Sequence, residues 1–271
     1  MIRVLMALLI FLVACPSWAA TTYVGGQVGG FAGTTSAQTI PFALSGGSDA
    51  TPQAGDTVIA SYCVGNNVDL TFAIRNTGAT DYTAFGTELY RDDSSDANLR
   101  TAYRVMPGTP ETDIVFTETV TGGTGTIADA GSYLIQVFRG VHATPLEQAV
   151  QEGTGINTII VNPGGLTPTT TGTVVYVVGC GALSTGVTYT SSDLTAFLTT
   201  NTVDTIDASI GGGYFEWTSG AFNPATFGIV GSDSAFASYA WHIVALAPAA
   251  DAPAAAGSPC GALMLLGVRG C

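Results

Sequence analysis

The feature that most constrains the fold is a series of short, β-prone segments separated by turns that are rich in glycine. Beyond residue 20, no stretch shows a sustained helical period with capping residues. Apolar and polar residues alternate in 70–74, 99–106 and 113–119, and further strand-like segments cover 57–64, 131–141, 173–180, 214–218 and 237–247. Alternation with a period of two is typical of strands. Many short strands between such turns predict a β-sandwich or a barrel.

We therefore expect an all-β domain over residues 21–248, built as a double-sheet, jelly-roll-like β-sandwich with at most one short helix. Segment 173–180 is almost wholly apolar, so we expect a strand that is buried on both faces. The one candidate helix begins near Ser191, where Ser191-Ser192-Asp193 resembles a helix N-cap in front of residues 194–198.

The two halves of this domain echo each other. Each begins with an apolar strand that ends in a cysteine, Cys63 or Cys180, and each later carries a Ser-Tyr strand, at Ser132 or Ser238. The segment 163–172 between them either links two small domains or crosses over within one sandwich. We favour a single jelly roll in which each half supplies similar strands to both sheets, because each half alone offers few recognisable strands.

The chain begins like a bacterial secretory signal. A cationic start that ends at Arg3 precedes an unbroken apolar run over 4–14, and Ser17 and Ala19 are small residues at the spacing that signal peptidase reads. We expect residues 1–19 to be removed and the mature chain to be exported, to the periplasm, the cell surface or the medium. Alternatively, 12–15 resembles a lipobox. Residues 1–14 would then be removed, and a lipidated Cys15 would tether the protein to a membrane.

Composition excludes several partners. The formal net charge is −13, the seven cationic residues are all arginine, and only 10% of the residues are charged. Nucleic acid and anionic lipid both need a basic face, so neither is an expected partner, and membrane contact is expected only through a lipid on Cys15. Residues 249–271 form an Ala/Pro-rich tail whose apolar end is too short to span a bilayer.

Cysteines add to the case for export. Cys15 leaves with the leader unless it is lipidated, and the remaining disulfide candidates are Cys63, Cys180, Cys260 and Cys271. An even number of cysteines in an oxidising compartment favours disulfides. Cys63 and Cys180 lie in similar strand contexts, which fit a bridge between them as well as two buried free thiols. Four cysteines allow three pairings, so the pairing stays open.

The candidate catalytic groups do not form a convincing set. Ser184 lies in a variant of the nucleophile elbow that follows an apolar strand. The acid and base of a triad would have to come from His242 with Asp204, Asp207 or Asp233. The elbow must lead into a helix, whereas 187–190 is β-prone, so we assign no catalytic residue.

Metal ligands are sparse in the sequence. His142 and His242 are far apart and lack companion ligands, which disfavours a zinc or copper site, and His242 is expected to pack within a strand. Calcium is the one candidate cofactor. Its candidate ligands in the densest oxygen cluster are Asp92, Asp93, Asp96 and Asn98. Ala97 and Tyr103 replace the glycine and the glutamate of an EF-hand, so a solvated acidic loop is the favoured interpretation.

Aromatic residues beside a carboxylate suggest a carbohydrate contact. Tyr214, Glu216 and Trp217 follow the glycine run 211–213, which we interpret as a flexible turn. Sugar sites combine aromatic platforms with carboxylates. Alternation places Trp217 on one face of a strand and Tyr214 with Glu216 on the other, so the simpler interpretation is a pair of core aromatics behind a turn.

Several turns and strand ends are familiar as a set: YVGGQVGG (23–30), TDY (80–82), ELY (88–90), ADAGSY (128–133), FRGV (138–141), TGI (154–156) and WTSGAF (217–222). With them the mature chain resembles a group of β-rich, jelly-roll-like proteins found in phages, prophages and proteobacteria. The resemblance implies a sandwich associated with virions or cell surfaces and transfers no catalytic residue. The secretory leader departs from a virion component and favours a surface or secreted role.

The sequence thus favours a non-catalytic extracellular β-sandwich used for surface assembly or adhesion, with itself, a surface glycan or a protein as partner. Low charge fits this role, because fewer charged groups would lose water at an interface. Two alternatives remain open. One is a secreted polysaccharide-acting hydrolase, and the other is a calcium-stabilised, lectin-like module.

Overall fold

A computed structural model describes residues 20–33, 37–66, 70–91, 96–120, 130–158, 162–183, 187–204, 206–224, 228–231 and 236–249 of the chain. Within these ranges the protein is all-β and contains no helix, and hence no helix long and apolar enough to cross a membrane. The strands are β1 Thr22–Ala32, β2 Ala37–Pro41, β3 Thr57–Asn66, β4 Leu70–Arg75, β5 Thr83–Arg91, β6 Asp96–Val105, β7 Asp113–Val120, β8 Ala130–Arg139, β9 Val141–Leu146, β10 Gln151–Thr158, β11 Val174–Leu183, β12 Val187–Thr190, β13 Thr195–Thr202, β14 Asp207–Glu216, β15 Gly228–Gly231 and β16 Phe236–Pro248.

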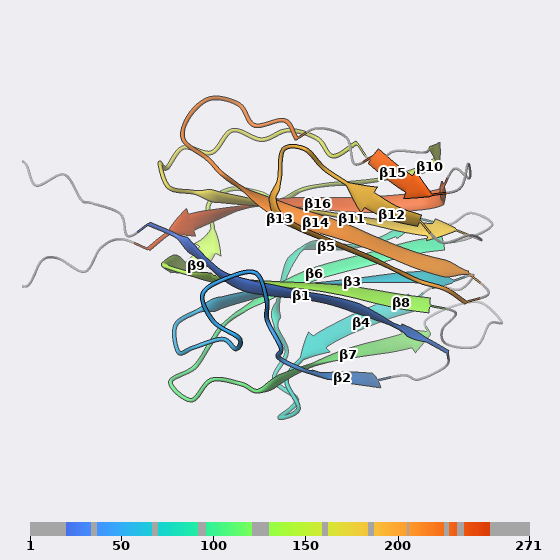
Figure 1. Cartoon of the computed structure of the whole chain (residues 1–271), viewed down its shortest axis with the longest axis horizontal. Helices are drawn as coiled ribbons and strands as arrows, with labels where there is room; N and C mark the ends of the chain where they lie inside the picture. The colour runs from blue at the N-terminus through green and yellow to red at the C-terminus, as the bar shows by residue number, and fades with distance from the viewer. Residues whose placement is uncertain are drawn as a thin grey trace, which may run out of the picture.

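The strands form four antiparallel sheets that stack in layers (Figure 1). A three-stranded sheet, β2-β7-β4, covers one face of the five-stranded sheet β1-β8-β3-β6-β5. The other face of that sheet packs on the six-stranded sheet β10-β16-β11-β14-β13, in which β9 also pairs with β16. The pair β12-β15 lies on the far side. The expected all-β sandwich is therefore confirmed.

The two halves of the chain build their sheets separately. Strands β1–β8 form the first two sheets and β9–β16 the other two, so the interpretation in which each half supplies strands to both sheets is wrong. The two large sheets nevertheless have the same strand order, with β1, β8, β3, β6 and β5 matched by β10, β16, β11, β14 and β13. The echo in the sequence corresponds to this repeated arrangement.

Strand β11 shows why the middle strands are apolar throughout. Tyr176 and Val178 point into the core between the two large sheets, while Val175 and Val177 point into the core under β12. A strand with cores on both faces needs apolar residues at successive positions. The expected burial of segment 173–180 on both faces is confirmed.

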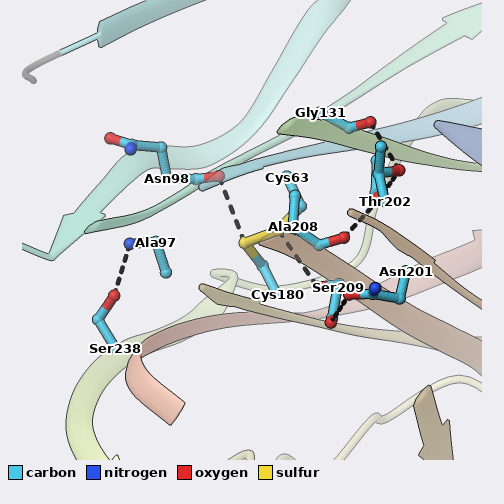
Figure 2. The surroundings of a disulfide bond; sticks show 11 residues. Cys63, Ala97, Asn98, Gly131, Cys180, Asn201, Thr202, Ala208, Ser209 and Ser238 are labelled. Atoms are coloured by element: carbon cyan, nitrogen blue, oxygen red, sulfur yellow. Dashed lines mark hydrogen bonds between the residues drawn. A yellow bond between two sulfur atoms is a disulfide. The ribbon is translucent and has the colours of Figure 1, made fainter. Parts of the chain in front are cut away.

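A disulfide joins the two halves across the core between the two large sheets (Figure 2). Cys63 of β3 and Cys180 of β11 occupy matching strands, are fully buried, and have Cα atoms 5.5 Å apart. Two serine hydroxyls also bond across the space between the large sheets. The Ser132 hydroxyl on β8 donates to the carbonyl of Ala208 on β14 (2.7 Å), and the Ser238 hydroxyl on β16 accepts from the amide of Ala97 on β6 (2.6 Å).

The candidate helix near Ser191 is not formed. Residues 195–202 are strand β13, which pairs with β14 through a bulge between Thr195 and Leu198. The hydroxyl of Thr199 accepts from the amide of Tyr189 (3.0 Å) and donates to the carbonyl of Ile210 (3.1 Å). Long-range pairing of a threonine-rich segment outweighs the local N-cap signal, since β-branched residues favour strands.

The glycine run 211–213 lies inside strand β14, so its interpretation as a flexible turn is wrong. A side chain at Gly211 would meet the Tyr189 ring at 2.7 Å, and one at Gly212 would meet the carbonyl oxygen of Val177 at 2.6 Å. Glycine is used here because neighbouring chain segments approach too closely for a Cβ atom.

Candidate functional site

β1 begins and β16 ends at the same end of the stack (Figure 1, left). A small cleft lies at this end. Its volume is about 180 Å³, and it is lined by Ala20, Thr21, Thr171, Gly172, Val174, Glu216, Trp217 and Thr218. Three segments that are far apart in sequence therefore meet at one place. Two of the residues that the sequence singles out, Glu216 and Trp217, are among them.

Pairing of β11 with β14 forms one wall of the cleft. Val174 lies opposite Glu216, and just beyond the strands the amide of Trp217 donates to the carbonyl of Thr173 (2.9 Å). The preceding turn is held by Glu147, whose carboxylate accepts from the amides of Thr169 and Thr170 and from two threonine hydroxyls, all at 2.7–2.8 Å. Burial raises the pKa of Glu147, but these hydrogen bonds outweigh that effect and lower it. The wall is therefore a fixed structure.

The opposite wall is the start of the described chain. Gly140, with φ +79°, follows β8, and a Cβ atom there would lie 3.0 Å from the carbonyl oxygen of Ala20. The Gly140 carbonyl accepts from the hydroxyl of Thr21 (3.4 Å) and from the amide of Ala249 (2.6 Å). The first and last described residues are thus held side by side next to the cleft.

The three candidate carbohydrate contacts do not share one surface. Tyr214 points into the core between the large sheets, with its ring centroid 5.2 Å from those of Tyr23 and Phe138. Trp217 packs in the core on the other face and is only 7% exposed, and its indole N–H donates to the carbonyl of Gly220 (2.8 Å). Only the carboxylate of Glu216 is exposed. The cleft therefore presents a carboxylate and a small part of a buried indole rather than an open aromatic platform.

His242, a candidate of the nucleophile-elbow hypothesis, lies buried between the large sheets. Its Nδ1 is 2.9 Å from the hydroxyl of Thr101, which continues through Ser61 (2.9 Å) to the hydroxyl of Tyr176 (2.8 Å). Its Nε2 is 3.2 Å from the carbonyl of Thr87 and 3.5 Å from the carboxylate of Glu152. Since a carbonyl can only accept, Nε2 carries the proton of the neutral ring and Nδ1 accepts from Thr101.

Burial lowers the pKa of His242 to about 4, against the raising effect of Glu152 and of the hydrogen bond to Thr87. At neutral pH the ring is therefore an uncharged link in a chain of hydrogen bonds between the two halves. This matches the expectation of a hydrogen-bonded packing residue. A side chain with no exposed surface cannot reach a substrate.

The other members of the hypothetical triad are dispersed. Asp204 accepts from the amide of Gly33 (2.9 Å), and the buried Asp207 accepts from the amide of Asp204 (2.8 Å). Ser184 and Asp233 lie outside the described residues. The strand β12 that follows Ser184 is the β structure that the sequence suggests, in place of the helix that an elbow requires. His142 is exposed and bonds locally to Thr144.

Of the candidate calcium ligands, Asp92 and Asp93 and the side chain of Asp96 lie outside the described part of the chain. Asn98 is 1% exposed, and neither atom of its amide has a hydrogen-bond partner among the described residues. Within the described ranges, no three acidic, histidine or cysteine residues cluster as a metal site. Asp96 pairs with the end of β3, near Asp207, whereas Glu216 lies nine residues further along β14, about 30 Å away. The cleft and the acidic segment are therefore at opposite ends of the strands.

Three arginine side chains in the described ranges, Arg100, Arg104 and Arg139, form internal ion pairs. Arg100 contacts Glu88 at 2.8 Å, and Arg104 pairs with Glu111. Arg139 donates two hydrogen bonds to the fully buried Asp56, at 2.8 and 3.0 Å. With a formal net charge of −13, the carboxylates that remain leave the surface acidic.

The leader 1–19 with Cys15, and the tail from residue 250 with Cys260 and Cys271, lie outside the described residues. The disulfide between Cys63 and Cys180 is one of the alternatives that the sequence left open. Comparison of the chain with known protein families, with curated proteins and with solved structures gives no match.

Proposed function

We propose that the mature chain is a non-catalytic extracellular module that assembles with copies of itself at a bacterial or virion-like surface, where it can also serve adhesion. The buried disulfide between the two halves supports an oxidising location, since cytosolic thiols are kept reduced. The buried, hydrogen-bonded state of His242 supports a structural use of the groups that could otherwise do acid-base chemistry.

The edge of β10 that has no partner strand among the described residues carries the assembly proposal. Of the four strands at the edges of the two large sheets, β1, β5 and β13 are irregular at bulges, whereas β10 pairs with β16 along its length without a shift. Bulges protect edge strands from pairing with another chain, and a regular edge invites it. The β10 edge is therefore the natural place for a second copy to add a strand.

The side chains along this edge fit the same proposal. Ile156 on β10 and Leu146 on β9, which lies along the same side of β16, are 40% and 43% exposed. The single charged side chain of β10 is Glu152, which accepts from the amide and the hydroxyl of Thr87 (2.9 and 2.6 Å). Two acidic copies repel each other, so they need a contact surface with few charges, and β10 carries only this one hydrogen-bonded carboxylate.

We expect the mature protein to self-associate and Ile156→Lys to return it to a monomer, because a charge at the centre of the contact loses its water. Light scattering coupled to size exclusion over a dilution series measures this. Val203→Lys is the matched control, since Val203 is 66% exposed beyond the end of β13 and the charge change is the same. A parent that stays monomeric at high concentration contradicts the proposal, as does equal dissociation by both variants.

Calcium stabilisation is a second candidate, favoured by the buried amide of Asn98. Among the described residues the carbonyl oxygen of this amide has no hydrogen-bond partner, which is costly for a buried group, and a bound cation would satisfy it. If the site exists, EDTA lowers the melting temperature and added calcium restores it, while Asn98→Ala removes the calcium response. An unchanged melting curve in EDTA rules this candidate out.

A further inference from the structure

We infer that the mature amino terminus lies in the cleft beside Glu216. Cleavage after Ala19 frees the α-amine of Ala20, and its ammonium pairs with the Glu216 carboxylate. The inference rests on the exported form proposed above. Hydrolysis of the Ala19–Ala20 bond consumes one water and leaves a carboxylate on Ala19 and an amine on Ala20. That amine is protonated at neutral pH.

The position of Ala20 is fixed independently of any leader. Thr22 pairs with Arg139 at the start of β1, Thr21 bonds to the carbonyl of Gly140, and the carbonyl of Ala20 packs over the same glycine. Ala20 and Thr21 thereby line the cleft that Glu216 lines from the other side. Before cleavage the nitrogen of Ala20 is an uncharged amide, so Glu216 gains a cationic neighbour only through processing.

The size and charge of the cleft fit a small cation. Its volume of about 180 Å³ lies below the usual range for organic ligands, about 300–1,000 Å³. Glu216 is exposed and has no ion pair within the described ranges. Tyr214 lies two residues before Glu216 on β14. Burial, together with the negative charge of Glu216, raises the pKa of Tyr214. A carboxylate in a small cleft, next to the first residue of the mature chain, is matched to an ammonium.

The test compares the mature protein that begins at Ala20 with the same protein extended by Ala19, each with and without Glu216→Gln. The pKa of the α-amine is measured by NMR after isotopic reductive methylation. In the form that begins at Ala20, we expect Glu216→Gln to lower the amine pKa by about half a unit, roughly a threefold change in its protonation equilibrium. Asp81→Asn, which removes an exposed carboxylate on the other half of the molecule, should leave the amine pKa unchanged.

The extended form distinguishes a specific ion pair in the cleft from a general effect of surface charge on the amine pKa. With Ala19 retained, the ammonium is displaced from the cleft, so Glu216→Gln should no longer shift its pKa. An equal shift in both forms, or no shift in the form that begins at Ala20, overturns the inference. Mass spectrometry of the exported protein is the second arm. A lipidated start at Cys15 overturns the inference but leaves the extracellular assembly proposal standing. A protein that stays monomeric but shows the amine pKa shift contradicts the assembly proposal and supports the inference.

Discussion

Replacing Cys63 and Cys180 together by alanine is expected to lower the free energy of unfolding by about 4–5 kcal/mol. The bond joins residues that are 117 positions apart, and a long closed loop removes more conformational entropy from the unfolded chain than a short one. Because the bridge connects the two large sheets, its loss also frees the two halves to separate during unfolding. Urea unfolding of the parent and the variant, followed by tyrosine fluorescence and circular dichroism, gives the difference.

The parent refolded in reductant is the matched control, because it keeps both sulfur atoms and lacks only the bond. It should lose nearly as much stability as the alanine variant, and the remaining difference measures packing of the two sulfurs. Both sulfurs are fully buried, so reductant should act on the native protein only after it unfolds. A double variant with the same urea midpoint as the parent would show that the bridge does not constrain the unfolded chain.

The strands that the sequence reveals most clearly are middle strands of the sheets. β3, β8 and β11 can be predicted because apolar residues occupy their positions continuously or in alternation. The edge strands β10 and β13 show no clear apolar pattern, because they are rich in glycine, threonine and asparagine and most of their described residues are only partly buried. Their strand character comes from pairing with β16 and β14, which local sequence does not record.

The difference between local sequence and long-range strand pairing also decides which residues of the cleft can be predicted. Glu216 and Trp217 stand out because they are neighbours in sequence. Ala20 and Thr171 could not be assigned to the same cleft, because only the pairing of β1 with β8 and of β11 with β14 brings them there. Likewise, the sequence does not reveal the separate assembly of the halves, since without the edge strands each half offers too few strands to form its own sheets.

Acidification is expected to cost the folded protein about 3 kcal/mol through His242, and His242→Gln should remove this cost. Burial lowers the pKa of His242 from 6.5 to about 4. Between about pH 6.5 and about pH 4, His242 is protonated in the unfolded chain but neutral in the folded protein, so the free energy of unfolding falls as the pH drops. The contribution is complete above about pH 6.5 and is lost by about pH 4, and a shift of about 2.5 units at about 1.4 kcal/mol each gives the magnitude.

Burial is the main reason why the folded protein resists the proton, and the hydrogen-bond chain adds to it. With neutral His242, the hydroxyls of Tyr176, Ser61 and Thr101 each donate to the next group, and the chain ends on Nδ1. A proton on Nδ1 must donate to Thr101, so the Thr101 hydroxyl can no longer donate to His242. One hydroxyl of the chain then has no acceptor inside the core, at a cost of about 1–3 kcal/mol. Glutamine can donate to the carbonyl of Thr87 and accept from Thr101, so it keeps the bonds without titrating.

Urea unfolding of the parent and of His242→Gln over a series of pH values separates this effect from other acid titrations. Burial raises the pKa of Glu88 and of Glu118, so their protonation favours the folded protein on acidification, opposite in sign to His242. Both glutamates are present in both proteins and cancel in the difference. The stability of the parent relative to the variant should therefore fall by about 3 kcal/mol from about pH 7 to about pH 4, whereas His142→Gln at the surface should follow the parent. Parallel curves for parent and variant would mean that His242 takes up its proton equally well in both states, and that the chain of hydroxyls does not hold it neutral.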